Sequence, residues 1–79
     1  MPRYFFNLRN DLDVDDHEGV VFPDLGEARL RGAAYAKNMA AVSVTEYGRI
    51  NLSHHIDIAD ETGQVLSTVR FGDVVKITG

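Results

Sequence analysis

Five carboxylates crowd a short stretch near the start of the chain, and they are the densest group of side chains with chemical potential. They are Asp11, Asp13, Asp15, Asp16 and Glu18. Asp11, Asp13 and Asp15 alternate as Ca²⁺ ligands do at positions 1, 3 and 5 of an EF-hand loop. The pattern then fails, because the sixth position needs glycine but is Asp16, and the twelfth needs glutamate but is Phe22. Weak Ca²⁺ or Mg²⁺ binding by the loop 10–19 is one hypothesis. We favour a solvated acidic loop that discourages strand pairing.

The three histidines are a second candidate for chemistry. His54 and His55 are adjacent, so on a strand they point to opposite faces. His55 and Asp57 share a face, as a histidine and its orienting carboxylate would. A site made of His17, His55 and Asp57 requires the acidic loop to fold over the sheet. Without metal-ligand spacing, we interpret these histidines as surface residues.

Nothing in the sequence has the spacing of a catalytic motif. Ser43, Ser53 and Ser67 lie outside any Gly-x-Ser-x-Gly elbow, and the glycines are isolated. The chain has no cysteine, which excludes disulfides, thiolate metal sites and cysteine nucleophiles. A chain of 79 residues also has little material for a ligand pocket. We therefore expect no enzymatic activity and no cofactor.

The charge balance argues against nucleic acid and membrane partners. The net charge is −4, and the eight lysines and arginines are scattered along the chain. Nucleic-acid binding draws on clustered basic residues, so the aromatic side chains are better explained as core than as a base-stacking platform. No apolar run approaches the roughly 18 residues of a membrane span. The absence of cysteine in so small a domain favours a reducing cytoplasm, or stability gained by self-association.

The first part of the chain predicts a hairpin with a long loop. Over Arg3 to Arg9 the side chains alternate, with Tyr4, Phe6 and Leu8 on one face and Phe5 on the other. The acidic loop 10–19 follows, and the apolar residues 20–22 form the expected second strand. Phe5 gives the second face of the sheet a large apolar group that must be covered or meet a partner.

The central part predicts a helix from Leu25 to about Val44. Asp24 is a good N-cap, and Glu27 stands three residues later, which is capping-box spacing. Gly48 is the expected stop. The predicted inward stripe has a helical period and a row of small side chains that allows close packing. Its members are Leu25, Ala28, Gly32, Tyr35, Ala36, Met39, Ala40 and Val42.

The last part predicts a second hairpin. Residues 54–60 alternate, with Ile56 and Ile58 on one face, and residues 64–70 form the partner strand after a turn at Gly63. Val65 and Val69 fall on one face of that strand. The segment 71–73 breaks the alternation, and residues 74–77 fit a fifth strand or a helical turn equally well.

Several of these elements resemble a family of short uncharacterised proteins of alphaproteobacteria, especially rhizobia, whose members begin MPRYFF. The resemblance covers nearly the whole chain and rests on residues 1–6, 16–19, 23–25, 56–60, 63–66 and 69–71. The family is a domain of unknown function, so the resemblance implies no catalytic residues. It implies a stand-alone bacterial protein.

Together these patterns predict a single α+β domain over residues 1–79. Its elements follow the order ββαββ, with an antiparallel sheet of about four strands and one helix packed on one face. Phe5, Leu66 and Thr68 fall on the opposite face, where exposed apolar groups would favour a partner. We therefore expect a protein-interaction module that forms a homo-oligomer or binds another protein through the open face or an edge strand. A cation or small-ligand sensor and a nucleic-acid-associated regulator are the alternatives.

Overall fold

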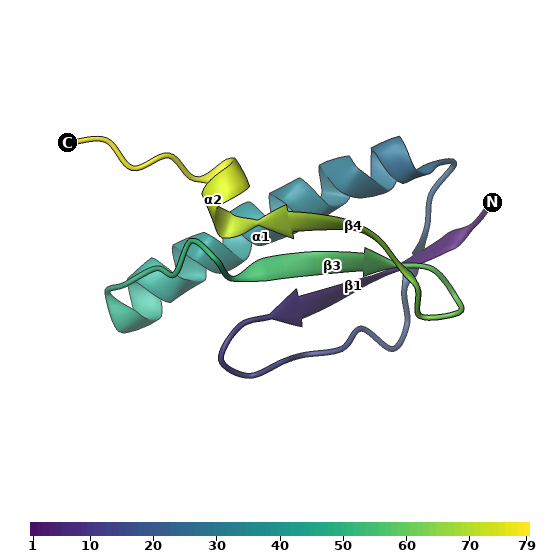
Figure 1. Ribbon diagram of the computed structural model, residues 1–79, viewed down its shortest axis with the longest axis horizontal. Helices are drawn as coiled ribbons and strands as arrows, with labels where there is room; N and C mark the ends of the chain where they lie inside the picture. Colours follow the sequence, from purple (N-terminus) through teal and green to yellow (C-terminus); the bar gives the residue numbers. More distant parts are fainter.

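A computed structural model describes residues 1–79 and has the predicted ββαββ order. The strands are β1 (Arg3–Arg9), β2 (Val20–Val21), β3 (His55–Ala59) and β4 (Val65–Arg70). They form one antiparallel sheet in the order β2-β1-β3-β4, and the helix α1 (Leu25–Tyr47) lies across one face of it (Figure 1). The predicted α+β class is therefore confirmed. The second strand is shorter than expected, since Phe22 lies outside it.

The core lies between the central strands and α1. Tyr4, Phe6 and Leu8 are buried, as the alternation along β1 predicts, and Ile56 and Ile58 of β3 are fully buried beside them. Phe22 packs against this group, with its ring 6.1 Å from that of Phe6 at 77°. The period-two pattern of the two central strands thus supplies one wall of the core.

The helix α1 begins where the sequence predicts and extends three residues further. The Asp24 carboxylate accepts a hydrogen bond from the Glu27 N–H at 2.9 Å, which caps the first turn. Gly48 ends the helix with φ 67°, a left-handed conformation that costs glycine little. The predicted end at Val44 is too early, because no breaker precedes Gly48.

The contact face of α1 is narrower than the predicted stripe. Its buried members are all small, namely Ala28, Gly32, Ala36 and Ala40. Leu25, Tyr35 and Met39 are half-buried at its flank, and Val42 is exposed. Small side chains occupy the line of contact because the helix axis lies close to the sheet. A Cβ on Gly32 would stand only 2.8 Å from the Ile58 Cδ1 atom.

The chain after β4 forms a short helical turn, α2 (Phe71–Val74), and then continues as an extended segment. Phe71 is buried, and its N–H donates to the His54 carbonyl at 2.8 Å. The turn therefore begins directly at the end of the strand. The sequence left a fifth strand or a helical turn open for residues 74–77. The structure has neither a strand nor a full helical turn there.

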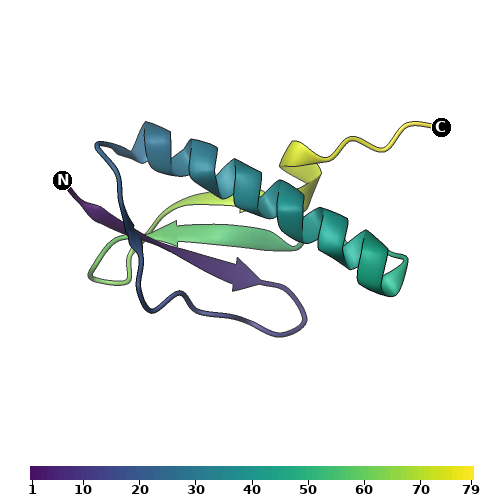
Figure 2. The same ribbon diagram turned by 180° about the vertical axis from the view of Figure 1, so that it is seen from behind.

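The molecule is elongated, and α1 is longer than the sheet that it covers. A helix of 23 residues spans about 34 Å, whereas the seven residues of β1 span about 23 Å. The extents are 42 × 23 × 16 Å. The C-terminal part of α1 projects beyond the strands in both views (Figures 1 and 2). We call this part, residues 42–47, the overhang.

Candidate functional site

The acidic loop runs along the outer edge of β1, where Asp16 is its anchor. One carboxylate oxygen of Asp16 accepts hydrogen bonds from the N–H groups of Glu18 and Gly19, both at 3.0 Å. The other accepts from the Phe6 N–H at 3.1 Å, and the Asp16 N–H donates to the Asn7 side chain at 2.9 Å. Asp16 therefore closes the loop and occupies a backbone donor of the β1 edge.

These contacts shift the acidity of Asp16. Partial burial by itself raises the pKa of the carboxyl group, but the hydrogen bonds from the N–H groups of Gly19, Phe6 and Glu18 outweigh it. The pKa of Asp16 is consequently lowered, because those bonds favour the charged form. The carboxylate is thus held in its ionised form by the fold of the loop.

The other carboxylates of the loop do not converge with Asp16. Asp15 pairs with Arg9 at 2.6 Å, and Asp11 faces His54 at 3.5 Å. The structure contains no group of three or more acidic or histidine side chains arranged to hold a metal ion, and Asp13 and Glu18 are exposed. The five carboxylates of the loop therefore do not gather around one point.

The open face of the sheet carries a polar cluster at one end. Asp57 lies at its centre, where it accepts a hydrogen bond from the Thr68 hydroxyl at 2.9 Å. The Arg9 Nε and His55 Nε2 atoms each lie 3.6 Å from a carboxylate oxygen of Asp57. The pKa of Arg9 is raised above its usual value, mainly because its side chain donates a hydrogen bond to Asp15. His17 is not part of this cluster, so the three-residue histidine site does not assemble.

The three residues expected to form an interface on this face, Phe5, Leu66 and Thr68, differ in their surroundings. Thr68 belongs to the polar cluster. Phe5 is half-buried, and a Cβ on Gly19 would lie 2.9 Å from its ring, so the loop covers part of it. Leu66 is 40% exposed. Val21 and Val65, which pair with Arg3 and Ala59 on this face, are 38% and 49% exposed. The open face therefore keeps exposed apolar groups beside the polar cluster.

Parts of both edges of the sheet already have hydrogen-bond partners or an irregular register. Beyond β1, Leu8 and Val14 exchange two backbone hydrogen bonds of 2.8 and 2.9 Å. On β4, the register shifts opposite Ile58 and Ala59, and such bulges twist an edge away from pairing. The outward N–H of Arg70 donates to the Asp73 carboxylate at 2.8 Å. These contacts occupy part of the β1 edge and the Arg70 end of β4.

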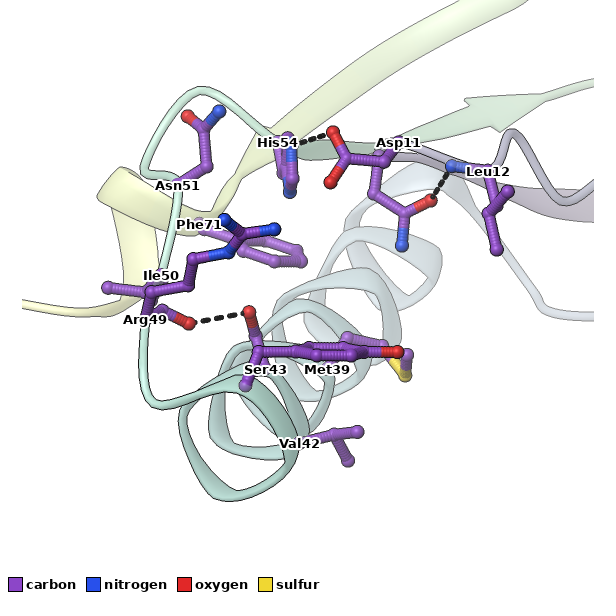
Figure 3. A pocket seen from close by; sticks show the side chains of 12 residues that line it. Asp11, Leu12, Met39, Val42, Ser43, Arg49, Ile50, Asn51, His54 and Phe71 are labelled. Carbon is purple, nitrogen blue, oxygen red and sulfur yellow. Dashed lines mark hydrogen bonds and ion pairs between the residues drawn. The ribbon is translucent and has the colours of Figure 1, made fainter.

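A concave feature lies under the overhang of α1. It is a groove of about 560 Å³, formed by α1, the tip of the acidic loop and the connection before β3 (Figure 3). Its lining residues are Asn10, Asp11, Leu12, Met39, Val42, Ser43, Tyr47, Arg49, Ile50, Asn51, His54 and Phe71. The volume falls within the range of roughly 300–1,000 Å³ for ligand sites. We call this feature the overhang groove.

Contacts between the three walls of the groove fix their relative positions. The Ser43 hydroxyl donates to the Arg49 carbonyl at 2.7 Å, which fastens the returning chain to the overhang. The His54 ring packs edge-on against Phe71, at 5.8 Å between centroids and 77°. The His54 and Asp11 pair joins the remaining wall, the tip of the acidic loop (Figure 3).

Sequence reasoning missed this groove, although part of its signal was present. Its apolar residues come from both sides of Gly48, and they meet only because α1 extends past the sheet. The sequence could have revealed the groove through the length of the helix. Apolar side chains continue along α1 to Tyr47, whereas the strands are at most seven residues long. A helix that outruns its sheet leaves part of its apolar face uncovered.

Comparison with known proteins gives a family and no activity. Neither a curated protein nor a solved structure matches the chain significantly. No helix of the structure has the length and apolar character that crossing a membrane requires. One family matches residues 3–72, from β1 to the start of α2. The chain therefore belongs to the family described as a domain of unknown function, DUF6894.

Proposed function

We propose that the chain is a non-enzymatic, cytoplasmic protein-interaction module that associates with a second copy of itself through the overhang of α1. The observation that carries the proposal is the exposure of Tyr47 on the overhang, 70%, beside a groove that no part of the same chain fills. Val42 and Leu12 are exposed at the same groove. Grouped apolar residues of this kind mark interaction sites.

The total surface supports the same interpretation. A monomer of this mass is expected to expose about 4,800 Å², whereas this chain exposes 5309 Å². The radius of gyration is 12.7 Å, against about 11.6 Å for a compact domain of this length. The chain thus leaves more surface uncovered than a compact monomer does, and the overhang and the extended residues 75–79 both contribute to it.

The positions of the titratable groups support a role without catalysis. His55 and Asp57, the pair most similar to a histidine with its orienting carboxylate, lie on the open face and away from the groove. Asp57 is already engaged by Thr68 and Arg9. The groove itself holds one histidine, which stacks on Phe71. The Ser43 hydroxyl, which lines the same groove, donates its hydrogen bond to the Arg49 carbonyl.

Sedimentation velocity over a wide concentration range tests the proposal. The wild-type chain is expected to move from a mass of 8.8 kDa toward about twice that value at high micromolar concentration. Tyr47→Ser should shift the transition to higher concentration, because a buried aromatic anchor is worth on the order of 2 kcal/mol at an interface.

Leu30→Ser is the matched control for Tyr47→Ser. Leu30 is 67% exposed on the same helix, about as much as Tyr47, but it lies outside the groove. It should leave the transition unchanged. A wild-type chain that stays monomeric at high micromolar concentration would refute self-association, and equal effects of the two substitutions would refute the assignment to the overhang.

A further inference from the structure

The last residues of the chain are extended and uncovered. Val75 has φ −120° and ψ 128°, and its N–H closes α2 by donating to the Phe71 carbonyl at 3.0 Å. Residues 76–79 carry no helix or strand, and Ile77 is 66% exposed. We call residues 75–79 the tail. In both views it projects away from the body of the molecule (Figures 1 and 2).

The tail and the overhang groove lie at the same end of the molecule but do not meet within one chain. Phe71 lines the groove, and the tail begins four residues later. No tail residue lines the groove. In Figures 1 and 2 the tail points past the end of β4 toward the side on which α1 ends. A second copy facing this end would meet both features.

We propose that two copies exchange their tails, with Ile77 of each copy inserted in the overhang groove of the other. This proposal rests on the self-association proposed above and names the segment that fills the groove. In extended chain, Val75 and Ile77 point to one side and Lys76 to the other. Val75 is partly buried against its own core, so Ile77 is the free apolar anchor. Five residues reach about 16 Å.

The groove has a mixed charge, because Asp11 and Arg49 both line it, and Asp11 is the group that attracts a basic tail. The groove rim carries Asp11, which is exposed and belongs to a chain of net charge −4. The tail carries Lys76 and no acidic side chain. With Ile77 in the groove, Lys76 points to the rim, where its long side chain can reach Asp11 of the other copy. The exchange is reciprocal, so two copies close the assembly and leave no groove free.

A mixed disulfide tests the geometry directly, because the chain contains no cysteine. Ile77→Cys in an isotope-labelled chain is mixed with Val42→Cys in an unlabelled chain, oxidised mildly and analysed by mass spectrometry. Val42 lines the groove. The control partner is Leu66→Cys on the open face, since Leu66 and Val42 are 40% and 39% exposed. The 77–42 disulfide should form at least tenfold faster than the 77–66 disulfide.

Sedimentation of the Ile77→Ser variant, and of variants in which the charges of Lys76 and Asp11 are swapped, completes the test. Ile77→Ser, which alters an exposed position, should weaken the dimer at least about 100-fold, because two buried side chains are lost. Lys76→Glu and Asp11→Lys should each weaken it a few-fold, and their combination should restore it.

The outcomes separate this proposal from the one on which it rests. If the wild-type chain dimerises, equal rates for the 77–42 and 77–66 disulfides of the cysteine variants would overturn the tail exchange and leave self-association standing. A dimer that Ile77→Ser does not weaken would do the same. A wild-type chain that remains monomeric at high micromolar concentration would overturn both.

Discussion

Replacing Gly32 by alanine measures how closely α1 lies on the sheet. In an open helix interior the change should stabilise the helix by about 0.8–1 kcal/mol. Here the new Cβ would stand 2.8 Å from Ile58 Cδ1, 3.4 Å from Ile58 Cγ1 and 3.6 Å from Val69 Cγ2. Ile58 is fully buried, so its methyl group has no open space into which it can move.

The two effects oppose each other, and packing is expected to win. Inserting a methyl group into a filled core costs about 1–3 kcal/mol. With the gain in helix propensity subtracted, Gly32→Ala should lower the free energy of unfolding by about 1 kcal/mol. Ile58→Val removes the nearest atom, so in that background the same substitution should raise the free energy of unfolding instead. The coupling should reach about 1.5–2 kcal/mol, well above the usual deviation from additivity.

Urea unfolding followed by circular dichroism, at one fixed protein concentration, measures all four chains of this cycle. Ala34→Gly, at an exposed position of the same helix, calibrates helix propensity and should cost about 1 kcal/mol. Stabilisation by Gly32→Ala in both backgrounds would refute the close approach of α1 to the sheet.

Three further substitutions test the loop and the helix ends. Because the pKa of Asp16 is lowered in the folded chain, its contribution to stability is present above about pH 4 and lost as the pH falls through the folded value. Asp16→Asn should cost about 1–2 kcal/mol at pH 7 and flatten the acid limb of a stability-against-pH curve; an unchanged limb would exclude this role. Asp73→Ala frees the Arg70 N–H and should cost about 1 kcal/mol in urea unfolding, whereas no loss would mean that the bond is not maintained in solution. Gly48→Ala places a side chain at φ 67° and should lower the free energy of unfolding by about 1 kcal/mol; a neutral result would contradict the left-handed helix end.

Most of the fold was predictable because local chemistry and tertiary structure agree in it. Asp24 caps α1 with its own side chain, and the alternation along β1 and β3 matches the buried face. The small size of Gly32 was interpreted as a sign of close packing, and Ile58 lies against it. In each case the residue type that favours the local structure also suits its neighbours.

The candidate site was less predictable because it depends on relative lengths and on non-local hydrogen bonds. Asp16 was grouped with the other carboxylates, yet its partners are backbone N–H groups that include Phe6, ten residues earlier in the chain. The open face was expected to carry Phe5 and Leu66 as apolar groups, and it also holds a polar pair that the alternation did not reveal, since Thr68 and Asp57 bond across β4 and β3. The overhang groove follows from the excess length of α1 over the strands, which alternation along each element does not reveal.

The central claim is that the chain associates with itself through the overhang groove. Two-dimensional NMR of an isotope-labelled wild-type chain during dilution tests this claim most directly. Between high and low micromolar concentration, the amide signals of Leu12, Val42, Tyr47 and Ile77 should shift together along one binding curve. Shifts confined to the amides of Leu66 and its neighbours on the open face, or spectra that do not depend on concentration, would contradict the account.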